Sequence, residues 1–160
     1  MIIITVFLLC LFSSSSYGGE DYNLVSFKGA AINIPEKWNV IEKDNCLFIK
    51  GEHVKTSDSL KFCREISSNE SNYFKINDNG EWEAVSDGIP VLADVNATSK
   101  FTSMSAIVSC KFKDDAGYHT EQCFQAEINL PLNISFIFIG RGDASLFKDY
   151  KEVYLSLKVK

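Results

Sequence analysis

Residues 129–160, NLPLNISFIFIGRGDASLFKDYKEVYLSLKVK, join an apolar run to the clearest helical pattern in the chain. The apolar run consists of Ile134, Phe136, Ile137, Phe138 and Ile139. After a glycine-containing break at residues 140–143, six apolar residues recur at steps of one, three and four: Leu146, Phe147, Tyr150, Val153, Tyr154 and Leu157. This spacing places them on one side of a helix. We therefore predict a buried strand, a turn and a final helix that packs on a sheet.

The break contains Arg141-Gly142-Asp143, the tripeptide that integrins bind. Its position between a strand and a helix favours a structural interpretation. Asp143 or Ser145 can accept hydrogen bonds from the first free N–H groups of the helix. We therefore interpret the tripeptide as a turn with a helix cap.

Residues 1–18 have the composition of a signal peptide. An apolar run of about ten residues precedes Ser13–Ser16, which is the length of a signal-peptide core and too short for a membrane span. No Lys or Arg lies near Met1, and Cys10 falls inside the apolar core. We predict cleavage after Gly18, a single mature domain at residues 19–160, and no transmembrane segment in the mature chain.

Removal of residues 1–18 leaves four cysteines: Cys46, Cys63, Cys110 and Cys123. An even number in an exported chain predicts two disulfides, with three pairings open. Pairing of neighbours would staple two hairpins. If Cys110 faces Cys123 directly, the turn of that hairpin falls at Ala116-Gly117. We predict no metal site, because the chain has no C-x-x-C cluster and His119 alone lies between two of the cysteines.

The rest of the mature chain favours β-structure. Short runs of apolar and β-branched residues alternate with turn signals such as Pro35, Asn79-Gly80 and Asp114-Asp115. Several runs alternate polar with apolar residues, which is typical of an antiparallel sheet with one wetter face. The predicted class is α+β: a mainly antiparallel sheet, a C-terminal helix packed on one face, and two disulfides.

The charge and the polar residues restrict the function. The chain has 16 Lys and Arg against 21 Asp and Glu, and a net charge of −5 without a basic stripe argues against nucleic acid. We predict that the protein is not an enzyme and needs no cofactor. Glu81, Glu83 and His119 are the candidates for catalysis, but no nucleophile with a partnered base accompanies them. Matches to the glycosylation sequon at Asn69, Asn96 and Asn133 are expected by chance in a chain rich in Asn and Ser.

Contacts with a partner are predicted around the long β-prone run and its turn. Trp82, Phe101 and Tyr118 are candidate anchors, because buried aromatic residues dominate many protein interfaces. Ser103, Ser105 and Asp115 are small or polar and can enter a polar cleft on a partner. The alternative for Ser103 and Ser105 is an ordinary exposed strand face.

Two pieces resemble the PsbP/Mog1/DcrB-like group. Residues 27–38, FKGAAINIPEKW, resemble the opening hairpin of that group, an apolar strand followed by Pro, two residues and Trp. Residues 136–157 resemble its ending, a hydrophobic strand, a glycine turn and a last helix on the sheet. The resemblance implies an α/β/α-sandwich or α+β fold and a binding or assembly role, with no catalytic residues.

A small, acidic, exported chain with disulfides is also similar in general type to periplasmic immunity proteins, which occlude the active site of a cognate toxin. We therefore expect a periplasmic or secreted bacterial binding protein, with an immunity protein as the first hypothesis and a toxin effector as its partner. A PsbP/DcrB-like ligand-binding or assembly module is the alternative. A large apolar cavity between sheet and helix would favour this alternative.

Overall fold

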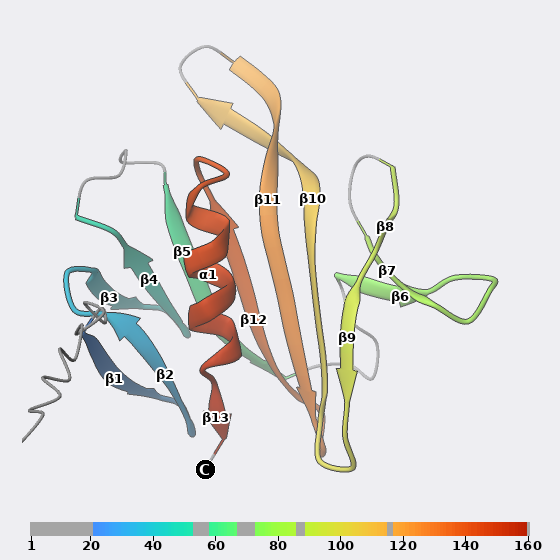
Figure 1. Ribbon diagram of the computed structural model, residues 1–160, viewed down its shortest axis with the longest axis horizontal. Helices are drawn as coiled ribbons and strands as arrows, with labels where there is room; N and C mark the ends of the chain where they lie inside the picture. The colour runs from blue at the N-terminus through green and yellow to red at the C-terminus, as the bar shows by residue number, and fades with distance from the viewer. Residues whose placement is uncertain (1–20, 53–57, 67–72, 86–88, 115–116, 160) are drawn as a thin grey trace, which may run out of the picture.

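The computed structural model describes residues 21–52, 58–66, 73–85, 89–114 and 117–159. Within these residues the chain forms thirteen β-strands and one α-helix (Figure 1). The described part contains no helix of the length and apolarity needed to cross a membrane. The predicted signal peptide and its cleavage site lie outside the described residues.

A seven-stranded antiparallel sheet forms the centre of the molecule. Its strands, in spatial order, are β3 (Asn39–Lys43), β4 (Cys46–Lys50), β5 (Ser59–Ile66), β12 (Ile134–Arg141), β11 (Gly117–Leu130), β10 (Thr102–Asp114) and β9 (Asp94–Ala97). The apolar run of the opening stretch is β12, the central strand. Its phenylalanines Phe136 and Phe138 are at most 1% exposed and stack on Phe62 of β5. This confirms that the run is a buried strand.

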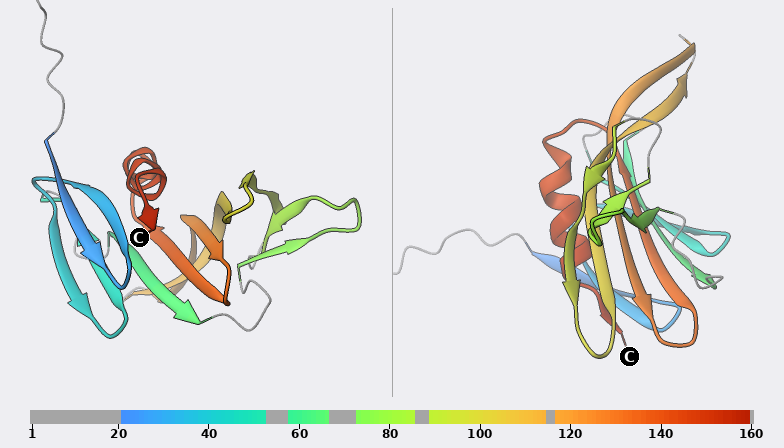
Figure 2. Two further views of the ribbon diagram at one scale, coloured as in Figure 1. Left: turned by 90° about the horizontal axis from the view of Figure 1, so that it is seen from below. Right: turned by 90° about the vertical axis from the view of Figure 1, so that its right-hand side faces the viewer.

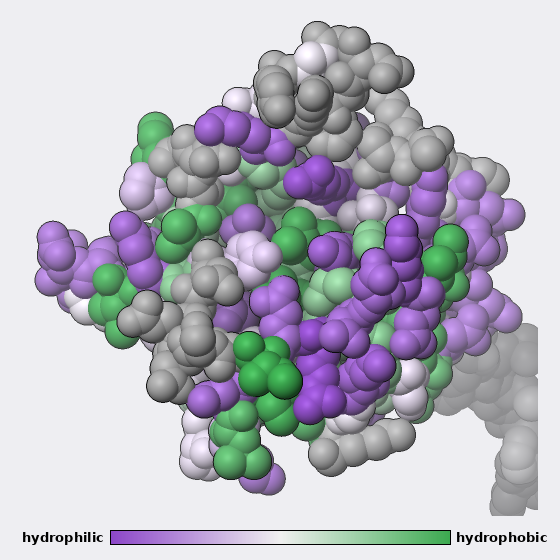
Figure 3. Space-filling view, turned by 180° about the vertical axis from the view of Figure 1, so that it is seen from behind, coloured by the Kyte–Doolittle hydropathy of each residue, from purple (hydrophilic) through white to green (hydrophobic). Residues whose placement is uncertain are grey.

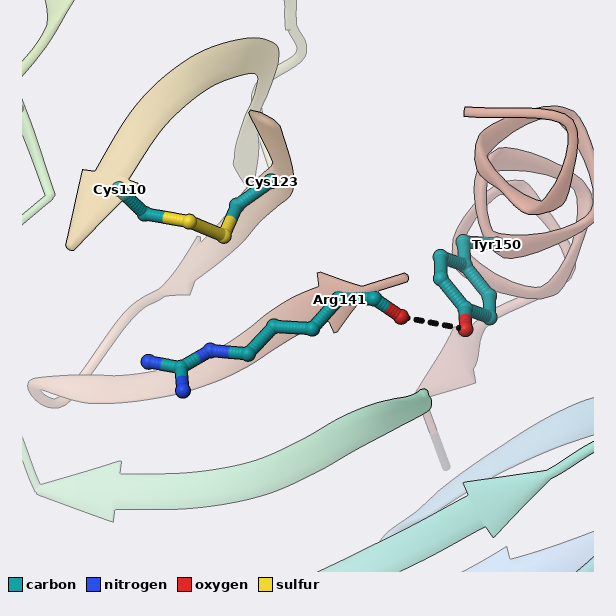
Figure 4. The surroundings of a disulfide bond; sticks show 4 residues. All are labelled: Cys110, Cys123, Arg141 and Tyr150. Atoms are coloured by element: carbon teal, nitrogen blue, oxygen red, sulfur yellow. Dashed lines mark hydrogen bonds between the residues drawn. A yellow bond between two sulfur atoms is a disulfide. The ribbon is translucent and has the colours of Figure 1, made fainter. Parts of the chain in front are cut away.

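The final helix, α1 (Leu146–Leu155), lies across one face of this sheet (Figures 1 and 2). Four of the six residues in its predicted apolar stripe are buried against the sheet: Phe147, Tyr150, Val153 and Tyr154. The Tyr150 ring lies directly over Gly140, and its hydroxyl donates a hydrogen bond of 2.9 Å to the Arg141 carbonyl (Figure 4). The glycine therefore lets the helix approach the sheet closely.

The turn before α1 is capped as predicted. The Ser145 N–H donates to Asp143 Oδ1 at 2.9 Å, whereas the Ser145 side chain makes no cap hydrogen bond. Asp143 is therefore the capping side chain of the two candidates. Gly142 has a φ of +124°, a backbone conformation that residues other than glycine rarely adopt.

A second, three-stranded sheet lies beside α1 on the same face. It consists of β1 (Tyr22–Phe27), β2 (Ala30–Pro35) and β13 (Lys158–Val159), with β2 in the middle. Phe27, Ile32 and Ile34 from this sheet join the same core as the central sheet and helix. Ser156 Oγ accepts the Asn33 N–H at 2.8 Å, so the end of the helix is tied to β2.

A third sheet covers part of the opposite face. It consists of β6 (Phe74–Ile76), β7 (Trp82–Ala84) and β8 (Val91–Leu92). Phe74 and Ala84 pack on Met104, Ala106 and Val108 of β10. The prediction of one wetter face is therefore only partly right, because this small sheet covers the β10 end. Figure 3 shows the rear of the molecule, where hydrophilic residues separate several hydrophobic ones.

Both disulfides are present between sequence neighbours. Cys46 and Cys63 are register partners on β4 and β5, with Cα atoms 4.1 Å apart. Cys110 and Cys123 are also bonded, but Cys110 pairs in register with Glu121, so the bridge runs diagonally with a Cα distance of 6.0 Å (Figure 4). The predicted direct register is therefore wrong by two residues. Residues two apart share a face of a strand, so either register brings the sulfurs together.

The fold agrees with the predicted class in outline. In the part of the chain that the structure describes, antiparallel strands dominate and a single ten-residue helix packs on one face. The long β-prone run becomes β10, and its return becomes β11. The residues between them, 115–116, lie outside the described part of the chain.

Candidate functional site

An open groove lies at the C-terminal end of α1, on the helix-covered face of the central sheet. We call it the helix-end groove; its volume is about 610 Å³. Its walls come from three parts of the chain: Asn96, Lys100, Phe101 and Ser103 around β9 and β10; Ile128, Leu130 and Pro131 at the end of β11; and Tyr154, Leu155, Leu157, Lys158 and Val159 after the last turn of α1.

The groove exists because the helix is shorter than the sheet beneath it. Ile128 and Leu130 point to the helix face, but α1 ends at Leu155. The chain then turns into β13, which pairs with β2 rather than lying over β11. The start of β10 and the end of β11, which lie side by side, are therefore left without a helix above them. Apolar side chains in this region form the floor of the groove.

The turn between β9 and β10 forms the opposite wall. Thr98 Oγ1 accepts the N–H groups of Lys100 and Phe101, each at 3.2 Å, and the Thr98 N–H donates to the Phe101 carbonyl at 2.9 Å. These bonds hold the turn in one conformation. Phe101 is partly buried against the main core, so the wall is attached to the body of the protein.

The inner end of the groove is polar. Ser103 is buried, and its hydroxyl donates to the Asn96 carbonyl at 3.2 Å. The pKa of the nearby Tyr154 hydroxyl is raised, mainly by burial and in part by the negative charge of Asp94. Hydrogen bonds with Ser103 and Ser105 act in the opposite direction and lower this pKa. Tyr154 therefore presents a neutral hydroxyl beside apolar walls.

Among the described residues, the only charged side chains that line the helix-end groove are Lys100 and Lys158, and both are exposed. Neither ammonium group forms an ion pair with any residue in the described ranges. The groove therefore combines mainly apolar walls with two positive charges at its opening that no described acidic residue neutralises.

Of two other hollows, one is smaller and the other is less suited to an apolar ligand. One of about 490 Å³ lies further along α1, where Lys151 Nζ and Asp94 Oδ2 form an ion pair of 2.7 Å between the helix and β9. Another, of about 670 Å³, lies beside the Cys46–Cys63 disulfide and is lined with Lys28, Arg64 and Glu65. This last hollow is larger, but four of its seven lining residues have charged or amide side chains, which favour water over an apolar ligand.

Of the residues predicted to contact a partner, Phe101 and Ser103 both line the helix-end groove. Ser105 is buried on the same face, below α1. The alternative of an exposed strand face is therefore wrong for both serines, which are 7% and 3% exposed and form hydrogen bonds with Tyr154 of α1.

The other three predicted contacts do not join this site. Trp82 is half-buried in the small sheet on the opposite face. Asp115 lies outside the described residues, and the structure describes only the backbone of Tyr118. Binding of a partner by these six residues stays a prediction.

The carboxylates considered for catalysis lie away from the groove. Glu83 pairs with Lys75 at 3.1 Å across β6 and β7, and Glu81 is exposed just before β7. The side chain of His119 is outside the described part. Among the described residues, no cluster of three or more His, Cys, Asp or Glu side chains is arranged to hold a metal.

The β11 and post-helix walls were missed from the sequence, although a signal was present. Leu157 continues the apolar stripe past the end of the helix, and Val159 adds another apolar residue before the end of the chain. Ile128 and Leu130 are equally apolar at the end of a long strand. The end of β11 and the residues after α1 together carry more apolar surface than a ten-residue helix can cover. This excess indicates that the space between them is not completely filled.

Comparison with known proteins extends only to the fold. No family model matches the chain, and no curated protein matches it. Among solved structures, the solution structure of cyanobacterial PsbP from Synechocystis sp. PCC 6803 is similar, with a TM-score of 0.51 and 9% sequence identity. The match covers 94% of this chain and 99% of that one. The expected PsbP-like fold is thereby supported over nearly the whole length.

Proposed function

We propose that this protein is an exported binding module of PsbP-like fold that holds an apolar ligand in the helix-end groove. The observation that carries the proposal is the groove itself, about 610 Å³ in volume, with mainly apolar walls and a few convergent polar groups. Small-molecule sites typically have about 300–1,000 Å³ and this same mixture of linings. An apolar cavity between sheet and helix is the feature expected of the ligand-binding alternative, and the groove lies at the edge of that space, beside the end of the helix.

The walls of the groove are held in place before any ligand binds. The Phe101 wall is fixed by the Thr98 turn, and the helix end is tied to β2 through Ser156. Leu157 and Leu130 pack partly against the main core. A preformed site loses little conformational entropy when it binds a ligand.

Export is supported by two independent features. The composition of residues 1–18 is typical of a signal peptide. The two disulfides belong to an oxidising compartment, because the cytosol keeps most thiols reduced. We propose that the mature protein acts in the periplasm or outside the cell.

The immunity-protein hypothesis has less support. Ser103 and Ser105, expected to enter the cleft of a toxin, are 7% and 3% exposed. An extended insertion into a partner would require the helix to move away from them. No specific observation on the described residues favours occlusion of an enzyme, so ligand binding is the function we propose.

The experiment is a titration of the mature, oxidised protein with an uncharged apolar fluorophore, N-phenyl-1-naphthylamine. The variant Asn96→Trp places a large ring on the helix-covered face of β9, where Asn96 lines the groove. Ala97→Trp is the matched control, because the next residue on a strand points to the opposite face.

We expect saturable binding at one site, a loss of affinity of about tenfold or more in Asn96→Trp, and nearly unchanged affinity in Ala97→Trp. Circular dichroism and thermal unfolding would establish that both variants are folded. Unsaturable binding, or an equal effect of both substitutions, would show that the groove is not the site.

A further inference from the structure

We propose that the ligand of the helix-end groove is a single-chain amphipathic anion, a long-chain carboxylate, whose charged group lies between Lys100 and Lys158. This inference rests on the proposed function and specifies the chemistry that the groove selects.

The charge of the groove is opposite to that of the protein. The whole chain carries −5, yet the described residues that line the groove include two lysines and no aspartate or glutamate. Other lysines near acidic residues are paired: Lys75 with Glu83 at 3.1 Å, and Lys151 with Asp94 at 2.7 Å. Lys100 and Lys158 have no such partner among the described residues. Their positive charge is therefore available to an anion.

The two lysines approach the groove from opposite walls. Lys100 is in the turn between β9 and β10, whereas Lys158 begins β13 beyond the end of α1. Both residues are exposed, so their ammonium groups remain hydrated at the mouth of the groove. A carboxylate held there keeps part of its water, whereas the same group deep against the apolar floor would lose its hydration without an opposite charge.

The floor of the groove fits the apolar part of the same molecule. Phe101, Ile128, Leu130 and Leu157 supply side chains without charge. Each methylene buried against them is expected to raise the affinity roughly fourfold, until the groove is filled. A molecule with one charged end and one alkyl chain therefore matches both parts of the groove.

The first measurement compares dodecanoate with dodecan-1-ol as competitors of N-phenyl-1-naphthylamine, at pH 8 and below the concentration at which either aggregates. An exposed ion pair changes an affinity by a factor of up to about five. With two lysines, we expect dodecanoate to bind roughly tenfold more tightly than the alcohol. This preference should shrink at high salt, because exposed charges are screened.

The double variant Lys100→Gln/Lys158→Gln should abolish the preference, because it lowers the affinity for dodecanoate by a larger factor than the affinity for dodecan-1-ol. Lys37→Gln/Lys43→Gln is the matched control, because it removes the same charge from exposed positions around β3, away from the groove. The control should keep the preference for dodecanoate.

The results separate this inference from the proposed function. Equal affinities for dodecanoate and dodecan-1-ol, both lost in Asn96→Trp, would overturn the anion proposal and leave the binding groove intact. Saturable fluorophore binding that neither competitor displaces would overturn it as well. Co-sedimentation with anionic phospholipid vesicles that depends on the two lysines, without binding of free dodecanoate, would assign them to a membrane surface and overturn the proposal.

Discussion

Gly140→Ala tests the packing of the helix on the central strand. Gly140 is on β12, and a Cβ built on it would lie 2.8 Å from Cε2 of the Tyr150 ring and closer still to Cδ2. The ring cannot easily move away. Its hydroxyl is bonded to the Arg141 carbonyl at 2.9 Å, and Trp38 lies against it edge-on at 5.8 Å between ring centroids.

Two effects of opposite sign decide the magnitude. Replacing glycine by alanine in a strand restricts the unfolded chain and favours folding by roughly 0.5–1 kcal/mol. Gly140 is not among the glycines with positive φ, so alanine brings no backbone strain. The clash opposes this gain, because inserting one carbon into a packed core costs about 1–3 kcal/mol and displacing the ring also weakens its hydrogen bond. We expect a net loss of about 2–3 kcal/mol.

Urea unfolding followed by tryptophan fluorescence measures this loss. With a slope of about 2 kcal/mol per molar, the midpoint should fall by roughly 1–1.5 M. In a Tyr150→Ala background the same substitution should be neutral or stabilising, because the ring that obstructs Cβ is absent. A loss below about 1 kcal/mol, or the same loss in both backgrounds, would refute the reasoning.

Two further predictions concern the hydrogen bonds that attach the helix to the two sheets. Burial, with Asp58 and Asp149 adding to it, raises the pKa of Tyr150 above its ordinary value. The folded protein therefore keeps a proton that the unfolded chain releases above about pH 10, so stability should fall as the pH rises beyond that value. Tyr150→Phe should flatten this fall in urea midpoints measured from pH 8 to 11, and it should cost about 1–3 kcal/mol at neutral pH through the lost hydrogen bond. Ser156→Ala leaves the Asn33 N–H without its acceptor and should cost about 1 kcal/mol, with faster amide hydrogen exchange at Asn33; unchanged exchange would contradict the proposed tie to β2.

Local patterns were sufficient for the elements that a short window describes. The steps of three and four from Leu146 to Tyr154 predicted a helix and its buried side, because both depend on residues within a few turns of each other. The apolar run of β12 and the cap at Asp143 are equally local. The PsbP-like arrangement was expected from the opening and closing pieces, and it extends over nearly the whole chain.

The candidate site was harder to predict because its walls are far apart in sequence. Ser103 and Phe101 were identified, but as exposed contacts for a partner rather than as the wall of a groove. A hydroxyl-rich strand segment has the same composition whether it faces solvent or a helix. Only the position of α1 decides between them, and it buries Ser103 and Ser105.

The sequence by itself determined the types of the elements, the expectation of two disulfides among four cysteines and the sign of the net charge, whereas the structure chose among the three possible pairings. Tertiary structure alone decided the diagonal register at Cys110, the cover over the β10 end and the helix-end groove. The physical reason is that side-chain periodicity describes which face of an element is apolar, but not what lies against that face. The groove forms where α1 ends before the apolar surface of β11 does, and that mismatch appears only when the two are packed together.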